Sequence, residues 1–260
     1  MAEFDLKAVE ADVRNTRFHG FLMHFRSVGS TNQLALEAAQ AGARAGVWIA
    51  DEQTAGRGRG GHQWHSAPGD GLYVSVLAAP RIGMGDAAKI PLANGLAAQA
   101  AIRETTGLTP DIRWPNDLMF GERKCGGILV ESASESGTEP MLRYAVIGIG
   151  INVDHGEFPG DLSKLATSLY LESGRSFRRE PLLAALLRHL DRELALLESD
   201  RSLLDRFAAA STWVSGKRVR VEEAGGYTGW TRGLDANGFL LVEDDLGVTR
   251  TVLSGGVRSA

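Results

Sequence analysis

Apolar positions along the first 155 residues fall into short runs separated by turn residues, a pattern typical of β-strands. These runs predict strands over residues 18–28, 47–50, 71–78, 111–114, 127–131 and 143–152. A turn at residues 120–123 makes the fourth and fifth of these strands a hairpin.

Longer alanine- and leucine-rich stretches predict helices between these strands. Ser30 and Gln33 have the spacing of a capping box, which predicts that a helix begins directly after the first strand. Apolar residues at helical spacing predict two further helices over residues 86–106 and 181–198. Strands and helices together indicate an α/β (α+β) domain.

The pattern changes after Trp213, where strand candidates become short and closely spaced. They cover residues 217–222, 227–234, 239–243 and 248–253. Gly225-Gly226 and Asn237-Gly238 supply turns between them. This spacing predicts a small closed barrel or meander, and hence two domains, residues 1–212 and 213–260.

Composition limits the cellular setting. The chain has 260 residues, 43% hydrophobic and 23% charged, and a formal net charge of -4, which gives no general attraction to nucleic acid. A single cysteine, Cys125, rules out an intrachain disulfide and favours a reducing compartment. The acidic N-terminus and the absence of an uncharged run of about 18 residues predict no signal peptide and no membrane span. We therefore expect a cytoplasmic protein without nucleic-acid or membrane partners.

Residues 53–64, QTAGRGRGGHQW, form what we call the glycine–arginine loop. Its glycines let backbone N–H groups approach an anion, and Arg57 and Arg59 add forked, permanently charged donors. The loop lacks the Lys-Ser/Thr of a P-loop and the helical continuation of a dinucleotide-binding turn. A flexible surface loop with solvated arginines is the alternative that the composition leaves open.

Three further clusters carry polar groups next to glycine or proline. They are RWPNDL at residues 113–118, KCGG at 124–127 and GIGIN at 148–152. Trp-Pro holds Asn116 and Asp117 together at a strand end, Lys124 can reach an anion beside paired glycines, and the third cluster leaves room for a ligand against a sheet. Each cluster alone has an ordinary structural explanation: a Pro-Asn-Asp turn, a solvated lysine, and tight packing of the sheet.

The cysteine and histidine residues give no pattern typical of a catalytic or metal site. Cys125 has no histidine partner at recognisable spacing, so it is expected to be a small apolar filler. The six histidines show no metal-ligand spacing, and no metal ligands are assigned.

The clusters GSTN (residues 29–32), QTAGRGRGGHQW, RWPNDL, KCGGILVE and GIGIN occur together and in one order. This combination resembles the biotin protein ligases over about residues 18–255. The resemblance implies a catalytic domain of the class II aminoacyl-tRNA-synthetase-like type followed by a small SH3-like β-barrel. Only 29 residues precede Ser30, so the resemblance is to the monofunctional form, without the N-terminal DNA-binding domain of the bifunctional members.

The resemblance also implies the activity. Such a ligase uses ATP and Mg²⁺ to convert biotin to biotinyl-5′-AMP, then transfers biotin to a lysine of a biotin carboxyl carrier domain of a biotin-dependent carboxylase. Biotin, ATP and the carrier protein are thus the expected partners, and the oligomeric state stays open, with a homodimer as one option.

The resemblance assigns roles to matched residues. Biotin-binding residues are expected to be Ser30, Thr31, Asn32, Gln53, Gly56, Arg57, Gly58, Arg59, Lys124, Gly126 and Gly127. ATP and adenylate are expected to contact Arg57, Arg59, Trp64, Asn116, Lys124 and Asn152. The catalytic residues are expected to be Arg59, Lys124 and Asp117. Asp117 is expected to orient Mg²⁺ or the incoming lysine, or to accept the lysine's proton.

Two rival functions are a lipoate ligase or octanoyltransferase-like acyl transferase, and a non-catalytic biotin-binding module. RWPNDL together with the glycine–arginine loop fits the biotin branch better than the lipoate branch. Arg57, Arg59 and Lys124 argue against a mere binder. The chain departs from the family pattern at KCGG, where a thiol stands next to the key lysine in place of the commoner aliphatic residue.

Overall fold

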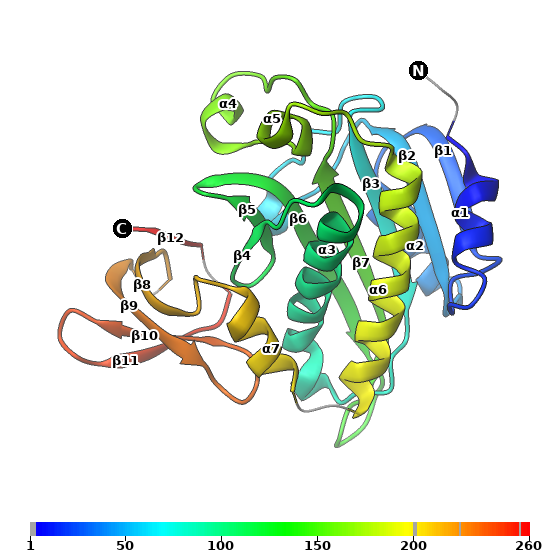
Figure 1. Cartoon of the computed structure of the whole chain (residues 1–260). Helices are drawn as coiled ribbons and strands as arrows, with labels where there is room; N and C mark the ends of the chain where they lie inside the picture. The colour runs from blue at the N-terminus through cyan, green and yellow to red at the C-terminus, as the bar shows by residue number, and fades with distance from the viewer. Residues whose placement is uncertain (1–3, 200–201, 224, 255) are drawn as a thin grey trace.

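The computed structural model describes residues 4–199, 202–223, 225–254 and 256–260, and builds them around two sheets (Figure 1). The large sheet contains β1 (Leu22–Val28), β2 (Gly46–Gln53), β3 (Gly71–Ala78), β4 (Asp111–Arg113), β5 (Asp117–Phe120), β6 (Arg123–Ser134) and β7 (Leu142–Asn152). The small sheet contains β8 (Ser215–Val221), β9 (Tyr227–Leu234), β10 (Leu240–Asp244), β11 (Thr249–Val252) and β12 (Val257–Ser259).

The helices are α1 (Leu6–Asp12), α2 (Thr31–Gln40), α3 (Ile90–Thr106), α4 (Leu162–Leu165), α5 (Leu169–Ser173), α6 (Arg179–Ser199) and α7 (Leu203–Ala210). Two 3₁₀ turns, η1 (Arg59–Gly61) and η2 (Met84–Lys89), complete the described elements. The large sheet has the order β1-β2-β3-β7-β6-β5-β4. Only β1 and β2 pair in parallel within it, because α2 carries the chain back between them.

Alternating side chains divide the large sheet into two buried faces. Val47 and Ile49 of β2 belong to the main core beneath α3 and α6. Trp48, between them in sequence, packs instead with Ala35 and Ala39 of α2 on the opposite face. The sheet is therefore a central layer with helices on both sides, which explains why its strands read as nearly continuous apolar runs.

The predicted elements are largely confirmed, with boundary corrections that have local causes. The first strand begins at Leu22 rather than at residue 18, because residues 17–20 form a turn that buries Phe18. The predicted turn at 120–123 is present, but it joins β5 to β6. The segment at 111–114 is a separate short strand, and the chain reverses after it at a cis Trp114–Pro115 peptide bond.

The predicted capping box is absent, and one helix was not predicted. Ser30 is the N-cap residue of α2, but its side chain makes no capping hydrogen bond, and Gln33 donates to Glu37 instead of reaching back. Helix α1 was not predicted, since its seven residues offer only one buried side chain, Val9, as a pattern.

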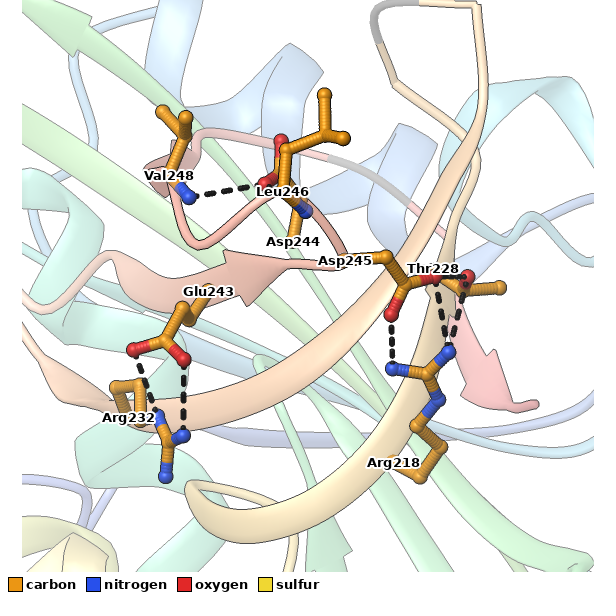
Figure 2. A network of polar contacts seen from close by, with 8 residues as sticks. All are labelled: Arg218, Thr228, Arg232, Glu243, Asp244, Asp245, Leu246 and Val248. Carbon is orange, nitrogen blue, oxygen red and sulfur yellow. Dashed lines mark hydrogen bonds and ion pairs between the residues drawn. The ribbon is translucent and has the colours of Figure 1, made fainter.

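The small sheet has the order β11-β10-β9-β8-β12, and its pairs are antiparallel. Figure 2 shows charged pairs on its surface: Arg218 donates to both oxygens of Asp245, and Arg232 donates to Glu243. Asp244 accepts from the backbone of Leu246 and Val248 and so closes the turn between β10 and β11. The inner side chains of this sheet join the same core as the large sheet.

Candidate functional site

The site begins where α2 stops covering its face of the large sheet. Three glycines follow on that face: Gly148 and Gly150 of β7, and Gly127, which pairs with Gly150 across β6. An added Cβ would lie 2.2 Å from Asn32 Oδ1 at position 148, and 2.5 Å from the Trp64 ring at position 150. Glycine is therefore required for these side chains to lie flat on the sheet, and Asn32 and Trp64, together with Gly127 and Gly148, line a cavity.

This cavity has a volume of about 910 Å³ and lies between the sheet, the glycine–arginine loop, the segment after β7 and the small sheet. Of the predicted site residues, it is lined by Ser30, Thr31, Asn32, Gln53, Arg57, Gly58, Arg59, Trp64, Asn116, Asp117, Lys124, Gly127 and Asn152. Residues from five separate sequence clusters thus face one space.

A chain of buried polar side chains lines one end of the cavity. Gln53 Oε1 accepts from the Thr31 backbone N–H at 2.9 Å, and Thr31 Oγ1 lies 2.8 Å from Ser75 Oγ. Ser75 Oγ donates to Asn32 Oδ1 at 2.6 Å. The hydroxyl of Ser30 is buried beside them and makes no hydrogen bond with any described residue. A buried polar group without a partner is costly, so this end of the cavity is suited to a polar ligand.

Opposite this end lies a charged cluster. Asp117 forms ion pairs with Lys124, through Oδ1, and with Arg113, 2.7 Å from Oδ2. The Lys124 ammonium also lies 5.3 Å from the centre of the Trp64 ring. Burial alone would raise the pKa of Asp117, but the charges of Lys124 and Arg113 outweigh it and hold the pKa below the ordinary value. Asp117 is thus a permanent carboxylate that fixes Lys124 at the cavity wall.

The glycine–arginine loop folds back over the cavity. Arg57 and Gln63 form an isolated antiparallel bridge, and Gly58 N–H donates to the carbonyl of His62. Arg59 reaches across, donating from Nη1 to Asn116 Oδ1 at 2.9 Å and from Nη2 to the carbonyl of Ser254, in the connection between β11 and β12. The hydrogen bond from Arg59 to Ser254 joins the glycine–arginine loop to the C-terminal part of the chain. The sequence did not predict this contact.

Asn116 and Asn152 also have structural partners. Asn116 Nδ2 donates to the carbonyl of Ile128 at 2.6 Å, and Asn152 Nδ2 donates to the carbonyl of Thr167 at 2.9 Å. The second bond ties β7 to Thr167, which directly follows the cavity-lining Ala166. Both amides therefore hold other parts of the wall in place.

Two predicted residues do not line the main cavity. Gly126 faces the opposite side of the sheet, where an added Cβ would lie 2.9 Å from Leu118. Gly56 lies at the base of the glycine–arginine loop, in tight contact with the Trp64 carbonyl and Ser66. Its role there is to allow the loop's close turn.

Sequence reasoning missed several residues at the site. Ser75 was hidden in the apolar strand GLYVSVLA, although a lone polar residue in such a run is itself a signal. Arg113 and Glu131 belong to the motifs RWPNDL and KCGGILVE, but no role was predicted for them. From the C-terminal part, the cavity is also lined by Glu222, Ser254, Gly256, Val257, Arg258 and Ser259, for which the sequence offered no signal.

Cys125 is fully buried and its burial raises the pKa of the thiol, which agrees with the expected apolar filler. Burial also lowers the pKa of His155, which stacks on Phe158 at 5.0 Å. Among the described residues, no three His, Cys, Asp or Glu side chains gather in a way that would hold a metal ion.

Comparison with known proteins identifies the family. Residues 24–152 match the Biotin/lipoate A/B protein ligase family, and residues 214–257 match the Biotin protein ligase C terminal domain. The Bifunctional ligase/repressor BirA of Bacillus subtilis is 32% identical over 88% of this chain and 71% of that protein. The chain belongs to the biotin protein ligase family.

Further relatives agree with this assignment. The biotin–[acetyl-CoA-carboxylase] ligase of Mycobacterium tuberculosis is 31% identical over 88% of this chain and 84% of that protein. The structure of the Aquifex aeolicus biotin protein ligase in complex with biotin and ATP has a TM-score of 0.77 and 27% identity, covering 93% of this chain and all of the other. The expected class II synthetase-like fold with a small C-terminal β domain is that of these ligases. None of the helices in the described part of this ligase has the length and apolarity needed to cross a membrane.

Proposed function

We propose that this chain is an ATP-dependent biotin protein ligase that forms biotinyl-5′-AMP and transfers biotin to a lysine of a carboxylase's carrier domain. One observation carries the proposal: a single cavity of about 910 Å³ has a buried polar end at Ser30, Thr31 and Gln53 and a cationic end at Arg59 and Lys124. Biotin has the same polarity, with a cyclic urea at one end and a carboxylate at the other.

The polar end supplies partners for the urea. The unpartnered Ser30 hydroxyl donates to the urea oxygen, while Gln53 Oε1 and Thr31 Oγ1 accept from urea N–H groups. Each such bond replaces one that the ring makes to water, which keeps its burial from being unfavourable. Because the glycines let Asn32 and Trp64 lie flat on the sheet, space remains above these side chains for the fused rings.

The cationic end supports the first step. A carboxylate oxygen of biotin forms a bond to the α-phosphorus of ATP, and the bond to the bridging oxygen breaks as pyrophosphate leaves. Two anions must approach each other, so Lys124, Arg57 and Arg59 lower the barrier by offsetting charge as it develops. Asn116 and Asn152 act by holding Arg59 and the segment after β7 in place.

In the second step the neutral amine of the carrier lysine attacks the acyl carbon, AMP leaves with the electron pair of the anhydride bond, and the proton lost from the nitrogen passes to water. We assign Asp117 to holding Lys124 in position, not to accepting the lysine's proton, because its lowered pKa makes it a weak base. Trp64 forms the surface between Lys124 and Gly150 against which the adenylate packs.

Mg²⁺ is expected with ATP, but the described side chains do not form a cage for it. Both oxygens of Asp117 are engaged by cations, and no group of three metal-binding side chains is present among the described residues. An Mg²⁺ ion held mainly by phosphate oxygens agrees with this donor set, and we route no step through protein–metal bonds.

Intact mass spectrometry tests the function. The chain is incubated with biotin, Mg-ATP and a purified carrier domain, and a gain of one biotinyl group on the carrier is expected. Reactions lacking ATP, or containing a carrier whose target lysine is replaced by arginine, serve as controls. Modification by lipoate or octanoate but not by biotin would refute the proposal, and ligand binding without pyrophosphate release would indicate a binding module.

A further inference from the structure

We propose that Glu131 is a positioning residue that fixes the orientation of the Asn32 amide, and through it the donor and acceptor roles of Ser75 and Thr31, and thereby selects a ligand bearing N–H donors. The inference deepens the proposed function, since it takes the cyclic urea of biotin as that ligand. Glu131 does not line the main cavity; it borders a smaller hollow beneath the glycine–arginine loop. It therefore acts on the ligand through other residues.

The chain of bonds starts at this carboxylate. Asn32 Nδ2 donates to Glu131 Oε2 at 2.8 Å, and a carboxylate can only accept, so the nitrogen of the Asn32 amide must face Glu131. The amide oxygen then faces Ser75, whose hydroxyl donates to it at 2.6 Å. Gly148 lets the amide lie flat on the sheet, since an added Cβ there would be 2.2 Å from Asn32 Oδ1.

Each hydroxyl of the buried polar chain has one proton, which limits the hydrogen bonds that it can donate. The Ser75 hydroxyl has one proton and donates it to Asn32. In the 2.8 Å contact between Ser75 and Thr31, the donor must therefore be Thr31. Thr31 Oγ1 also donates to Gln53 Oε1 at 3.0 Å, so its single proton is shared between Ser75 and Gln53. Gln53 cannot rotate its amide to compensate, because its Nε2 donates to Ser66 at 3.1 Å. The oxygens of Thr31 and Gln53 thus draw on too few protein protons, and a ligand N–H that donates to either of them supplies the missing one.

The opposite arrangement shows what Glu131 prevents. If the Asn32 amide turned over, its nitrogen would donate to Ser75, Ser75 would donate to Thr31, and Thr31 would donate to Gln53. The gap between Thr31 and Gln53 would then be filled by a proton of the protein, and a ligand N–H would find one acceptor fewer. Reversal of the Asn32 amide next to Glu131 would therefore change the hydrogen bonds of Ser75, Thr31 and Gln53, and through them those of the ligand.

The test uses Glu131→Gln, which keeps the shape but offers a donor as well as an acceptor. We expect its Kd for biotin, measured by calorimetry without ATP, and its KM for biotin to rise about tenfold, the effect of one hydrogen bond. The KM for ATP should stay within about twofold, because the cationic end is untouched. Glu135→Gln, which removes an exposed carboxylate four residues further along the chain, is the matched control and should leave Kd unchanged.

A charge swap separates this role from a general structural one. Asn32→Asp alone places two carboxylates against each other and should weaken biotin binding as well. The double variant Asn32→Asp/Glu131→Gln restores one donor facing one acceptor, and leaves an aspartate oxygen to accept from Ser75. It should bind biotin more tightly than either single variant, even if a single variant folds poorly. Normal binding by Glu131→Gln, or a double variant no better than the singles, would overturn the proposal.

A ligand-free measurement keeps this result distinct from the proposed function. The side-chain amide NMR signal of Asn32, identified by its loss in Asn32→Asp, should shift in Glu131→Gln and not in Glu135→Gln. An unchanged signal in Glu131→Gln refutes the bond to Glu131 whatever the ligand is. If the wild-type protein shows this bond but binds no biotin, the function proposed above fails. The assignment of donors and acceptors in the buried polar chain then still holds.

Discussion

Replacing Asp117 by asparagine should lower both the stability of the fold and the rate of adenylate formation. Asn keeps the shape of the side chain but removes the charge that pairs with Lys124 and Arg113. Asp117 and Arg113 side chains are only 15% and 11% exposed, so two cations would be left with little solvent to stabilise them. Breaking such a pair costs about 3 kcal/mol of the free energy of unfolding.

That loss corresponds to a fall in Tm of roughly 6–12 °C for a chain of this size. Asp86→Asn is the matched control, because Asp86 pairs with Lys89 at the surface and is 48% exposed. Its loss should cost no more than about 0.5 kcal/mol. The Asp117 effect should also depend on pH: a lowered pKa means that the stabilisation is complete above the ordinary value of 3.8 and is lost as pH falls below it. The difference in unfolding free energy between wild type and Asp117→Asn should therefore narrow on acidification.

Two kinetic assays decide what Asp117 does. Pyrophosphate release reports the first step, and transfer from preformed biotinyl-5′-AMP to the carrier reports the second. If Asp117 positions Lys124, Asp117→Asn should slow pyrophosphate release about 100-fold, the cost of misplacing a charged group by about 1 Å. A variant of wild-type stability that releases pyrophosphate normally but fails in transfer would refute this reasoning and identify Asp117 as the proton acceptor.

Three further changes probe the same cavity. Lys124→Ala should reduce pyrophosphate release about 100- to 1,000-fold while circular dichroism shows a folded chain; near-normal release would contradict its role. Arg59→Gly should weaken biotin binding and let biotinyl-5′-AMP escape, so that a blot detects biotin on added serum albumin; equal labelling by wild type would argue against retention by Arg59. Gly150→Ala should cost about 1–3 kcal/mol of stability by displacing the Trp64 ring, whereas Gly156→Ala, with no atom within 4 Å of the added Cβ, should not; equal melting temperatures would contradict this.

The strands of the large sheet were predictable because their signal is local. A buried strand such as β3 reads as an apolar run whatever it packs against, and its bounds, Gly71–Ala78, were predicted correctly. Ser30 shows the limit of local rules: it stands at the start of α2 as predicted, yet its hydroxyl faces the cavity instead of the helix N-terminus. A capping pattern cannot reveal that a ligand site competes for the same side chain.

The connections within the site could not be predicted, because they join residues far apart in the chain. Asn32 and Glu131 are 99 positions apart, and Arg59 and Ser254 are 195 apart. No periodicity or turn rule relates such pairs. The motifs showed which residue types gather, but the neighbours of Ser75 and Glu131 across the sheet follow only from the register of β3, β7 and β6.

The two central cations of the cavity differ in what already compensates their charge, and this difference should separate their functions. Lys124 is paired with the carboxylate of Asp117, so we expect it to bind phosphate only by sharing or exchanging that partner. Arg59 is held by two neutral oxygens, of Asn116 and Ser254, and forms no ion pair with any described carboxylate. Neutral acceptors fix the geometry of a guanidinium and leave its charge available. We therefore expect Arg59 to be the cation that an anionic adenylate engages without displacing a protein carboxylate, and we expect its hydrogen bond to Ser254, between β11 and β12, to help retain the intermediate.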